Sequence, residues 1–375
     1  MRLRIKTQLL AALGLCLALV AVLAGRPGVA EDRITLRGNY YREQSTRILA
    51  PVVYVEKDAP DERFTIGAEY LLDAVTSASI GAGAAAVTGG DFLFTEFRHE
   101  STVRFNSKLK LWNFGGYFRY STESDWISRS FGLYASRDLF NRAGTISVSY
   151  TGNFDSVNRI YGGRVIGWKS TGDTNLQNLN FVSIGYTHAL HPRLLGGVLG
   201  EGIYATGPQD NPYRKVINGL DESHPLLRRR GAVSGFFRFA VPRTSLVLEP
   251  RYRLSGDDWG IVTHGLDMRA HIRFLKRVIL RARYRYYTQT GAYFWLPDGN
   301  YGPTAVYRTA DPKMTRFHSH TPGIELTFEL DGLATRVPGL HWLRGAWVSA
   351  TYNHIFQTNR FGNARLGSLA FSIPF

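Results

Sequence analysis

The sequence contains almost no cysteine. Its 375 residues include one, Cys16, which lies in an apolar run near the amino terminus. The remainder of the chain therefore has no disulfide bond, no cysteine metal site and no thiol nucleophile. Leu15 directly precedes Cys16 in the middle of that run, which makes a lipoprotein signal a poor interpretation.

Long apolar runs are also absent beyond residue 30. Residues 1–30 combine a basic start, an apolar run at 9–23 and the small residues Gly28, Val29 and Ala30. This pattern predicts a secretory signal peptide that is cleaved near Ala30. The alternative is an uncleaved membrane anchor, but the run is shorter than the roughly 20 residues that a spanning helix needs. We expect residues 1–30 to be the signal peptide and residues 31–375 to form one domain.

Acidic residues are scarce relative to basic ones. The chain has 45 Lys and Arg against 30 Asp and Glu, and loss of residues 1–30 would leave a net charge of +11. The positive charge is dispersed along an exported chain, so a nucleic-acid partner is not expected. No glycine loop stands in the strand-to-helix context that phosphate binding requires, including residues 81–90, and no cofactor is expected.

What the sequence does contain is aromatic residues, glycine and strict alternation. It has 22 Phe, 20 Tyr, 7 Trp and 39 Gly. In residues 144–155, Ile146, Val148 and Tyr150 alternate with small polar residues, so that one face is apolar and the other polar. A soluble sandwich can also contain such a strand, but it would rarely repeat the pattern along a whole chain.

Sixteen segments repeat this pattern. They begin with the residues near 34–43 and continue at 46–56, 64–73, 93–105, 109–122, 126–138, 144–155, 177–190, 193–206, 229–241, 244–256, 259–274, 277–290, 315–329, 343–356 and 362–375. Connections after odd-numbered segments are often long and those after even-numbered ones nearly all short, which is typical of outer-membrane barrels. We predict an all-β fold, a transmembrane antiparallel β-barrel of about 16 strands (14 to 18) in the cell outer membrane.

The last segment ends on an aromatic residue, Phe375, after alternating Leu369, Phe371 and Ile373. We expect this strand to be read by the barrel-assembly machinery, and the outer surface to contact membrane lipid and lipopolysaccharide. The sequence leaves open whether the barrel is monomeric or trimeric.

Six short strings carry a resemblance to a known family. They are YLLDAVTSAS at 70–79, TEFRHE at 95–100, YFRYSTESD at 117–125, QDNPYR at 209–214, DDWG at 257–260 and YRYY at 284–287. From Glu69 onward the chain resembles a bacterial family catalogued as domain of unknown function 3570 (DUF3570), whose members look like outer-membrane barrels. The resemblance implies that fold and brings no activity with it.

Continuing the alternation places a row of arginines inside the barrel. We call these nine residues the basic wall: Arg230, Arg238, Arg251, Arg253, Arg269, Arg273, Arg281, Arg283 and Arg285. Glu249 and Asp267 share their strand faces. One interpretation is a positive surface that favours anions. The other is a ladder of ion pairs across the bore, with Glu43, Glu69, Glu96, Glu100, Glu325 and Glu329 as partners.

Two histidine patterns point outward. His264, His318 and His320 are predicted near the outer rim, where a surface metal site is a weak alternative to lipid contact. His99 and Ser101 share an outward face and match the His-x-Ser pair of outer-membrane phospholipases, although Thr102 stands where that pattern has Asn. The leading hypothesis is a pore for small solutes, with an anion preference set by the basic wall; the alternatives are a closed structural barrel that binds partners and an outer-leaflet lipid enzyme.

Overall fold

The computed structural model describes residues 32–44, 46–59, 63–77, 94–161, 164–166, 175–211 and 214–375. The predicted signal peptide and the small-residue segment 81–90 lie outside these residues. In this described part of the chain, no helix is long and apolar enough to cross a membrane.

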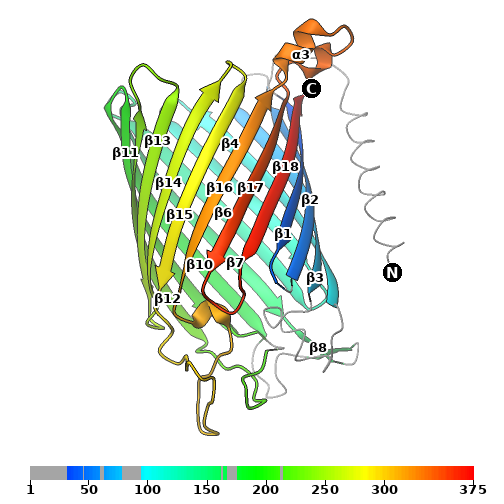
Figure 1. Ribbon diagram of the computed structural model, residues 1–375, viewed down its shortest axis with the longest axis vertical. Helices are drawn as coiled ribbons and strands as arrows, with labels where there is room; N and C mark the ends of the chain where they lie inside the picture. Colours follow the sequence, from blue (N-terminus) through cyan, green and yellow to red (C-terminus); the bar gives the residue numbers. More distant parts are fainter. Residues whose placement is uncertain are drawn as a thin grey trace.

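Sixteen of the described strands close into one antiparallel barrel, as the alternation predicts (Figure 1). The first eight are β1 (Arg33–Arg42), β2 (Thr46–Asp58), β3 (Phe64–Ser77), β4 (Phe94–Leu109), β5 (Trp112–Thr122), β6 (Trp126–Leu139), β7 (Gly144–Val157) and β10 (Leu176–His191). The other eight are β11 (Leu194–Thr206), β12 (Leu227–Ala240), β13 (Leu246–Asp257), β14 (Val262–Phe274), β15 (Val278–Gln289), β16 (Phe317–Glu329), β17 (Trp347–Gln357) and β18 (Ala364–Pro374).

The remaining elements lie outside the barrel wall. They are the hairpin of β8 (Arg159–Tyr161) and β9 (Arg164–Ile166), the helix α3 (Asp331–Arg336) and the 3-10 turns η1 (Pro312–Met314) and η2 (His341–Leu343).

The two ends of the chain close the barrel. β1 pairs with β18 from Arg33 opposite Pro374 to Arg42 opposite Arg365. On the inner face, Thr35 Oγ1 donates to Ser372 Oγ at 2.9 Å, and both residues are buried. Closure leaves no open sheet edge, which hydrocarbon could not hydrogen-bond.

Alternation divides every strand between lipid and the enclosed space, which we call the bore. On β7, Ile146 and Val148 are exposed on the outer surface. The residues that alternate with them, Ser147 and Ser149, point to the inner face. There Ser149 Oγ lies 2.7 Å from Ser183 Oγ of β10. The predicted two-sided pattern is therefore the pattern of the folded wall.

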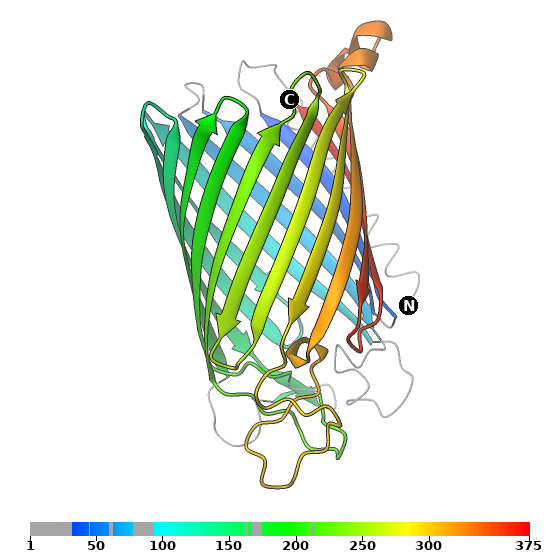
Figure 2. The same cartoon turned by 60° about the vertical axis from the view of Figure 1, so that its left-hand side comes forward.

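The connections sort by length between the two ends of the barrel. The long-loop end carries the connections 207–226 and 290–316, whose described residues Figure 2 shows below the strands. The other end, the short-turn end, carries both ends of the barrel sheet and tight turns. Leu275 and Lys276 form one of them with φ of 46° and 63°, the left-handed pair that suits a two-residue hairpin.

Several predicted strands begin later than expected, and two of them show a local cause. The segment predicted to start at residue 259 becomes β14 at Val262, because Asp257 Oδ1 accepts the backbone N–H of Trp259 at 3.1 Å and of Ile261 at 2.9 Å. This turn at 257–261 ends the pairing of β13 with β14 at Val262. The segment predicted from residue 343 becomes β17 at Trp347, because residues 341–343 form η2 at the short-turn end.

Inside the bore, tyrosine rings cover glycines of neighbouring strands. A Cβ added to Gly115 would lie 2.2 Å from Tyr134 Cε1, and one added to Gly132 would lie 2.1 Å from Tyr117 Cε1. Glycine at these two positions lets the rings lie flat against the backbone, an arrangement that pins strand register.

We therefore expect Gly115→Val to displace the Tyr134 ring and to lower the free energy of unfolding by about 1–3 kcal/mol. Gly38→Val is the matched control, since a Cβ at Gly38 has no atom within 4 Å. The urea midpoint in lipid vesicles measures both. Equal midpoints for the two variants would contradict the packing role.

Candidate functional site

The strands β12 to β15 bring the basic wall together on the inner face. Their registers place Arg251 opposite Asp267, and Asp267 opposite Arg285. In the adjacent row, Glu249 lies opposite Arg269. Carboxylates and guanidinium groups thus occupy neighbouring positions on the sheet, within reach of each other.

Glu249 is the centre of the largest ion-pair network in this wall. Its side chain accepts Arg238 Nε at 2.8 Å, and it lies 3.4 Å from Arg251 Nη2 and 3.6 Å from Arg269 Nη1. Glu249 is 1% exposed, so the three guanidinium groups compensate for its lost hydration. Asp267 has a similar role, accepting Arg269 Nε and Arg283 Nε at 2.9 Å each.

Pairs with neighbouring strands complete the network. Arg273 Nη2 lies 2.9 Å from Glu329 Oε1, and Arg281 pairs with Glu325. Arg253 pairs with Glu201 of β11, a residue that the sequence did not identify. The alternation of β11 could have identified Glu201, because it places this residue on the inner face, two strands from Arg253.

The predicted ladder forms only in part among the described residues: Glu325 and Glu329 pair with wall arginines, but the other four predicted carboxylates do not. Glu69 instead lies 3.1 Å from Arg104 on the adjacent strand, and Glu96 accepts the backbone N–H of Ser124 at 3.1 Å. Glu43 and Glu100 make no ion pair with the basic wall in this part of the chain. Strands are about 4.8 Å apart within a sheet, so side chains reach neighbours rather than the opposite wall.

The arginines of the wall are only partly buried. The side chains of the seven paired arginines are 34–53% exposed, from Arg269 to Arg273, although they point into the bore. Arg230 and Arg285 have no carboxylate within ion-pairing distance among the described residues. Seven arginines share the five carboxylates of Glu201, Glu249, Asp267, Glu325 and Glu329, and Arg230 and Arg285 add two further positive charges, so positive charge remains in excess.

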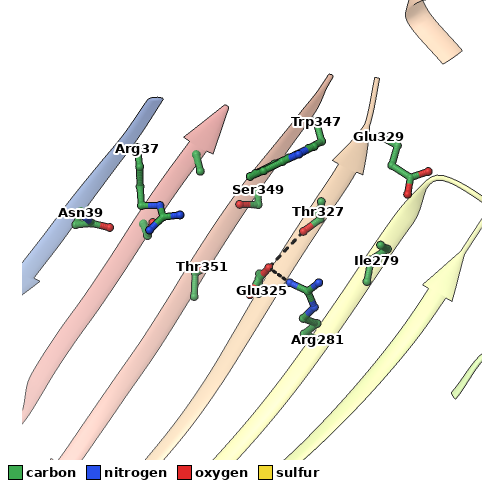
Figure 3. A pocket seen from close by; sticks show the side chains of 12 residues that line it. Arg37, Asn39, Ile279, Arg281, Glu325, Thr327, Glu329, Trp347, Ser349 and Thr351 are labelled. Carbon is green, nitrogen blue, oxygen red and sulfur yellow. Dashed lines mark hydrogen bonds and ion pairs between the residues drawn. The ribbon is translucent and has the colours of Figure 1, made fainter. Parts of the chain in front are cut away.

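A cavity of about 510 Å³ opens from the bore beside this wall near the short-turn end (Figure 3). Figure 3 shows Arg281 and Thr327 reaching Glu325 from one side, while Arg37 and Trp347 lie across from them. The lining therefore joins β1 and β15 to β18 around one inner space.

The long connection 290–316 folds largely outside the bore. It extends beyond the barrel end in Figure 2 and packs with the connection 207–226. Their shared polar centre is Glu222, whose Oε1 accepts Thr309 Oγ1 at 3.0 Å and the N–H of Ala310 at 2.7 Å. An apolar cluster of Trp259, Ile261, Ala292, Phe294 and Met314 lies beside it. We call this folded pair of loops the outer cap.

The outward histidines lie where the alternation puts them, in contact with tyrosines. His264 Nδ1 is hydrogen-bonded to Tyr252 Oη at 2.6 Å and His320 Nδ1 to Tyr284 Oη at 2.6 Å. The ring of His318 meets that of His320 edge-on, with centroids 5.8 Å apart. These contacts suit an aromatic girdle at the interface.

The other candidate pair, His99 and Ser101, is not joined by a hydrogen bond in the described structure. His99 Nδ1 is hydrogen-bonded to Tyr70 Oη at 2.7 Å. A nucleophile needs its base within hydrogen-bond reach, so this arrangement does not assemble the Ser–His contact.

A carboxylate cluster at the long-loop end escaped the sequence reading. Glu96, Glu123 and Asp125 place one oxygen each within 4.8 Å of one another. The register of β4 and β5 creates it, because it brings the connection after β5 beside the start of β4. Ser124 donates to Glu96, so the cluster is hydrogen-bonded within itself.

Together, the closed sheet, the apolar outer surface and the charged bore define an outer-membrane β-barrel. The chain belongs to the family described as protein of unknown function (DUF3570), whose model matches residues 91–337. No curated protein sequence matches the chain.

Solved structures share the fold at very low sequence identity. A bacterial polysaccharide outer-membrane secretin matches with a TM-score of 0.51 and 6% identity, over 92% of this chain and 98% of that one. The OccD3 (OpdP) protein of Pseudomonas aeruginosa matches with a TM-score of 0.48 and 9% identity, over 94% and 93%. A BenF-like porin from Pseudomonas fluorescens Pf-5 matches with a TM-score of 0.46 and 10% identity, over 92% and 98%.

We expect Glu249→Gln to lower the free energy of unfolding by roughly 1–3 kcal/mol, because three arginines lose one shared carboxylate. Glu329→Gln is the control, since its partner Arg273 is half exposed and screened by water. Urea titration in vesicles compares the two. A smaller loss for Glu249→Gln than for Glu329→Gln would contradict the central role of Glu249.

A second prediction concerns pH and the outer cap. His224 is buried against Trp259 and Phe294, and burial lowers its pKa to about 4. The unfolded cap takes up this proton near the usual value of about 6.5, whereas the folded cap excludes it until about 4. Stability of the cap is therefore complete above that window and falls as pH decreases through it.

Hydrogen exchange of peptides covering 214–228, corrected for the intrinsic rate at each pH, measures this loss. Exchange should accelerate between pH 7.5 and pH 5 in the native chain and much less in His224→Gln. The same acceleration in both proteins would exclude His224 as the cause.

Proposed function

We propose that this protein is a water-filled pore of the outer membrane for small solutes, with a preference for anions. The observation that carries the proposal is the partial exposure of the wall arginines within the bore. Charged side chains keep such exposure only where water reaches them. Barrels of this size generally enclose an aqueous channel.

The positive excess supports the anion preference. Seven wall arginines lie within ion-pairing distance of a carboxylate. In the described part of the chain Arg230 and Arg285 do not, and their charge adds to that of the shared networks. A low-dielectric wall of one sign concentrates the opposite ion inside a channel. The position of the outer cap beyond the strands supports a bore that is not filled by connection 290–316.

The alternatives predict different outcomes. A closed structural barrel that binds periplasmic or surface partners would conduct no ions. An outer-leaflet lipid enzyme would need His99 to leave Tyr70 and reach Ser101.

We also propose that the outward tyrosine–histidine pairs contact lipopolysaccharide and that the assembly machinery recognises β18 and Phe375, because both surfaces face the membrane or its edge.

The test of the pore is recording from purified, folded protein in a planar bilayer. We expect discrete steps of conductance. A heat-modifiable band on a gel shows independently that the inserted protein is folded. Folded protein that never produces steps would favour the closed barrel.

The preference for anions is tested by Arg251→Gln, Arg253→Gln and Arg283→Gln combined. Each change removes a cation, and Arg253→Gln also removes the arginine that pairs with Glu201, so the reversal potential under a salt gradient should move toward cations. Arg344→Gln is the matched control, with one lost charge at the short-turn end outside the barrel wall. An unchanged reversal potential in the triple variant would show that the basic wall is not the filter.

A further inference from the structure

The bore contains a second cavity at the long-loop end. It measures about 660 Å³ and lies between the inner faces of β10 to β17 and the 3-10 turn η1. Arg230, Arg285 and Tyr287 line it from the barrel, while Lys313 and Met314 line it from η1. A space of this size accommodates a small organic molecule.

Two of its arginines are available to a ligand. The third arginine of the lining, Arg228, is neutralised, because its Nε donates to Asp257 Oδ2 at 2.9 Å and its guanidinium lies 4.1 Å from the Trp259 ring centroid. Arg230 and Arg285 have no carboxylate within ion-pairing distance in the described structure, and both side chains are exposed. Arg285 lies over the Tyr287 ring at 5.6 Å, which orients its guanidinium.

The roof of the cavity is held in place by a buried glutamine. Gln289 Nε2 donates to the carbonyl oxygens of Lys313 and Thr315, both at 2.8 Å. Its Oε1 accepts Tyr287 Oη at 2.8 Å. The turn η1 is thus fixed to the barrel wall beside the arginines, so the cavity exists before a ligand arrives.

The rest of the lining suits an apolar ligand body. Apolar side chains line the cavity from six strands or turns, and they are Leu179, Ala205, Ile261, Met314, Phe317 and Ile355. A hydrated inorganic anion would gain nothing from these side chains, whereas a hydrocarbon body would.

We propose that this cavity is a binding site for a small organic carboxylate with an apolar body, on its way through the bore. The guanidinium groups of Arg230 and Arg285 hold the carboxylate, since their planar donors match its two oxygens. The apolar side chains cover the hydrocarbon part. The proposal rests on the proposed pore for its transport role, but the site itself can be measured without conduction.

Equilibrium binding to detergent-folded protein tests the site, with benzoate as the probe. We expect saturable binding that weakens at least tenfold in the double variant Arg230→Gln, Arg285→Gln and is partly restored by lysine at both positions. The double variant Arg336→Gln, Arg344→Gln, with both charges lost at the short-turn end outside the barrel wall, is the matched control and should bind as the native chain does. Gel mobility before and after heating shows that each variant is folded.

Two further probes separate the chemistry. Benzyl alcohol has the same ring without charge, and inorganic phosphate has charge without an apolar body, so both should bind much more weakly than benzoate. Equal binding of benzoate by the native chain and the double variant, or binding of phosphate as tight as that of benzoate, would overturn the proposal.

Bilayer recording distinguishes this failure from failure of the pore. If the site and the pore are both correct, benzoate reduces the chloride current of the native chain at concentrations where the double variant still conducts. Benzoate binding without conductance would contradict the proposed pore but support the binding site. Conductance without saturable benzoate binding would support the pore but contradict the binding site.

Discussion

Hydrogen bonding between β1 and β18 is the constraint on which the rest of the structure depends. Every backbone N–H and C=O that crosses hydrocarbon needs a partner in the protein. The ten-residue pairing from Arg33 to Arg42 supplies the last row of partners and turns a sheet into a cylinder. Once closed, the cylinder gives each residue only two environments, lipid or bore, and the charge distribution follows from that division.

The length of the side chains determines which charges pair inside the bore. A side chain meets its neighbour on the next strand, so networks run around the wall, as from Arg238 through Glu249 to Arg269. The opposite wall is out of range, and β3 and β4 form separate pairs such as Glu69 with Arg104. This leaves an arginine-rich side whose excess charge faces the bore rather than being cancelled by carboxylates of the opposite wall.

Much of this architecture is written in the alternation of the sequence. The sixteen strands, the sorting of long and short connections and the inner position of the basic wall follow from period-two patterning. The exact partners do not, because they depend on register: Glu201 meets Arg253 only when β11, β12 and β13 are aligned. The outer cap could not be predicted from the sequence for a related reason, since Glu222 binds Thr309, which lies 87 residues away in the chain.

The proposed function depends on water filling the bore. Because the only cysteine, Cys16, lies in the predicted signal segment, single cysteines can report on it. Thr351 lines the inner cavity, whereas its neighbour Ala350 pairs with the exposed Leu369 on the outer face. In the folded barrel in membranes, Thr351→Cys should react with a charged, membrane-impermeant thiol reagent and Ala350→Cys should not. An unreactive cysteine at 351, or the reverse order of reactivity, would contradict a water-filled bore.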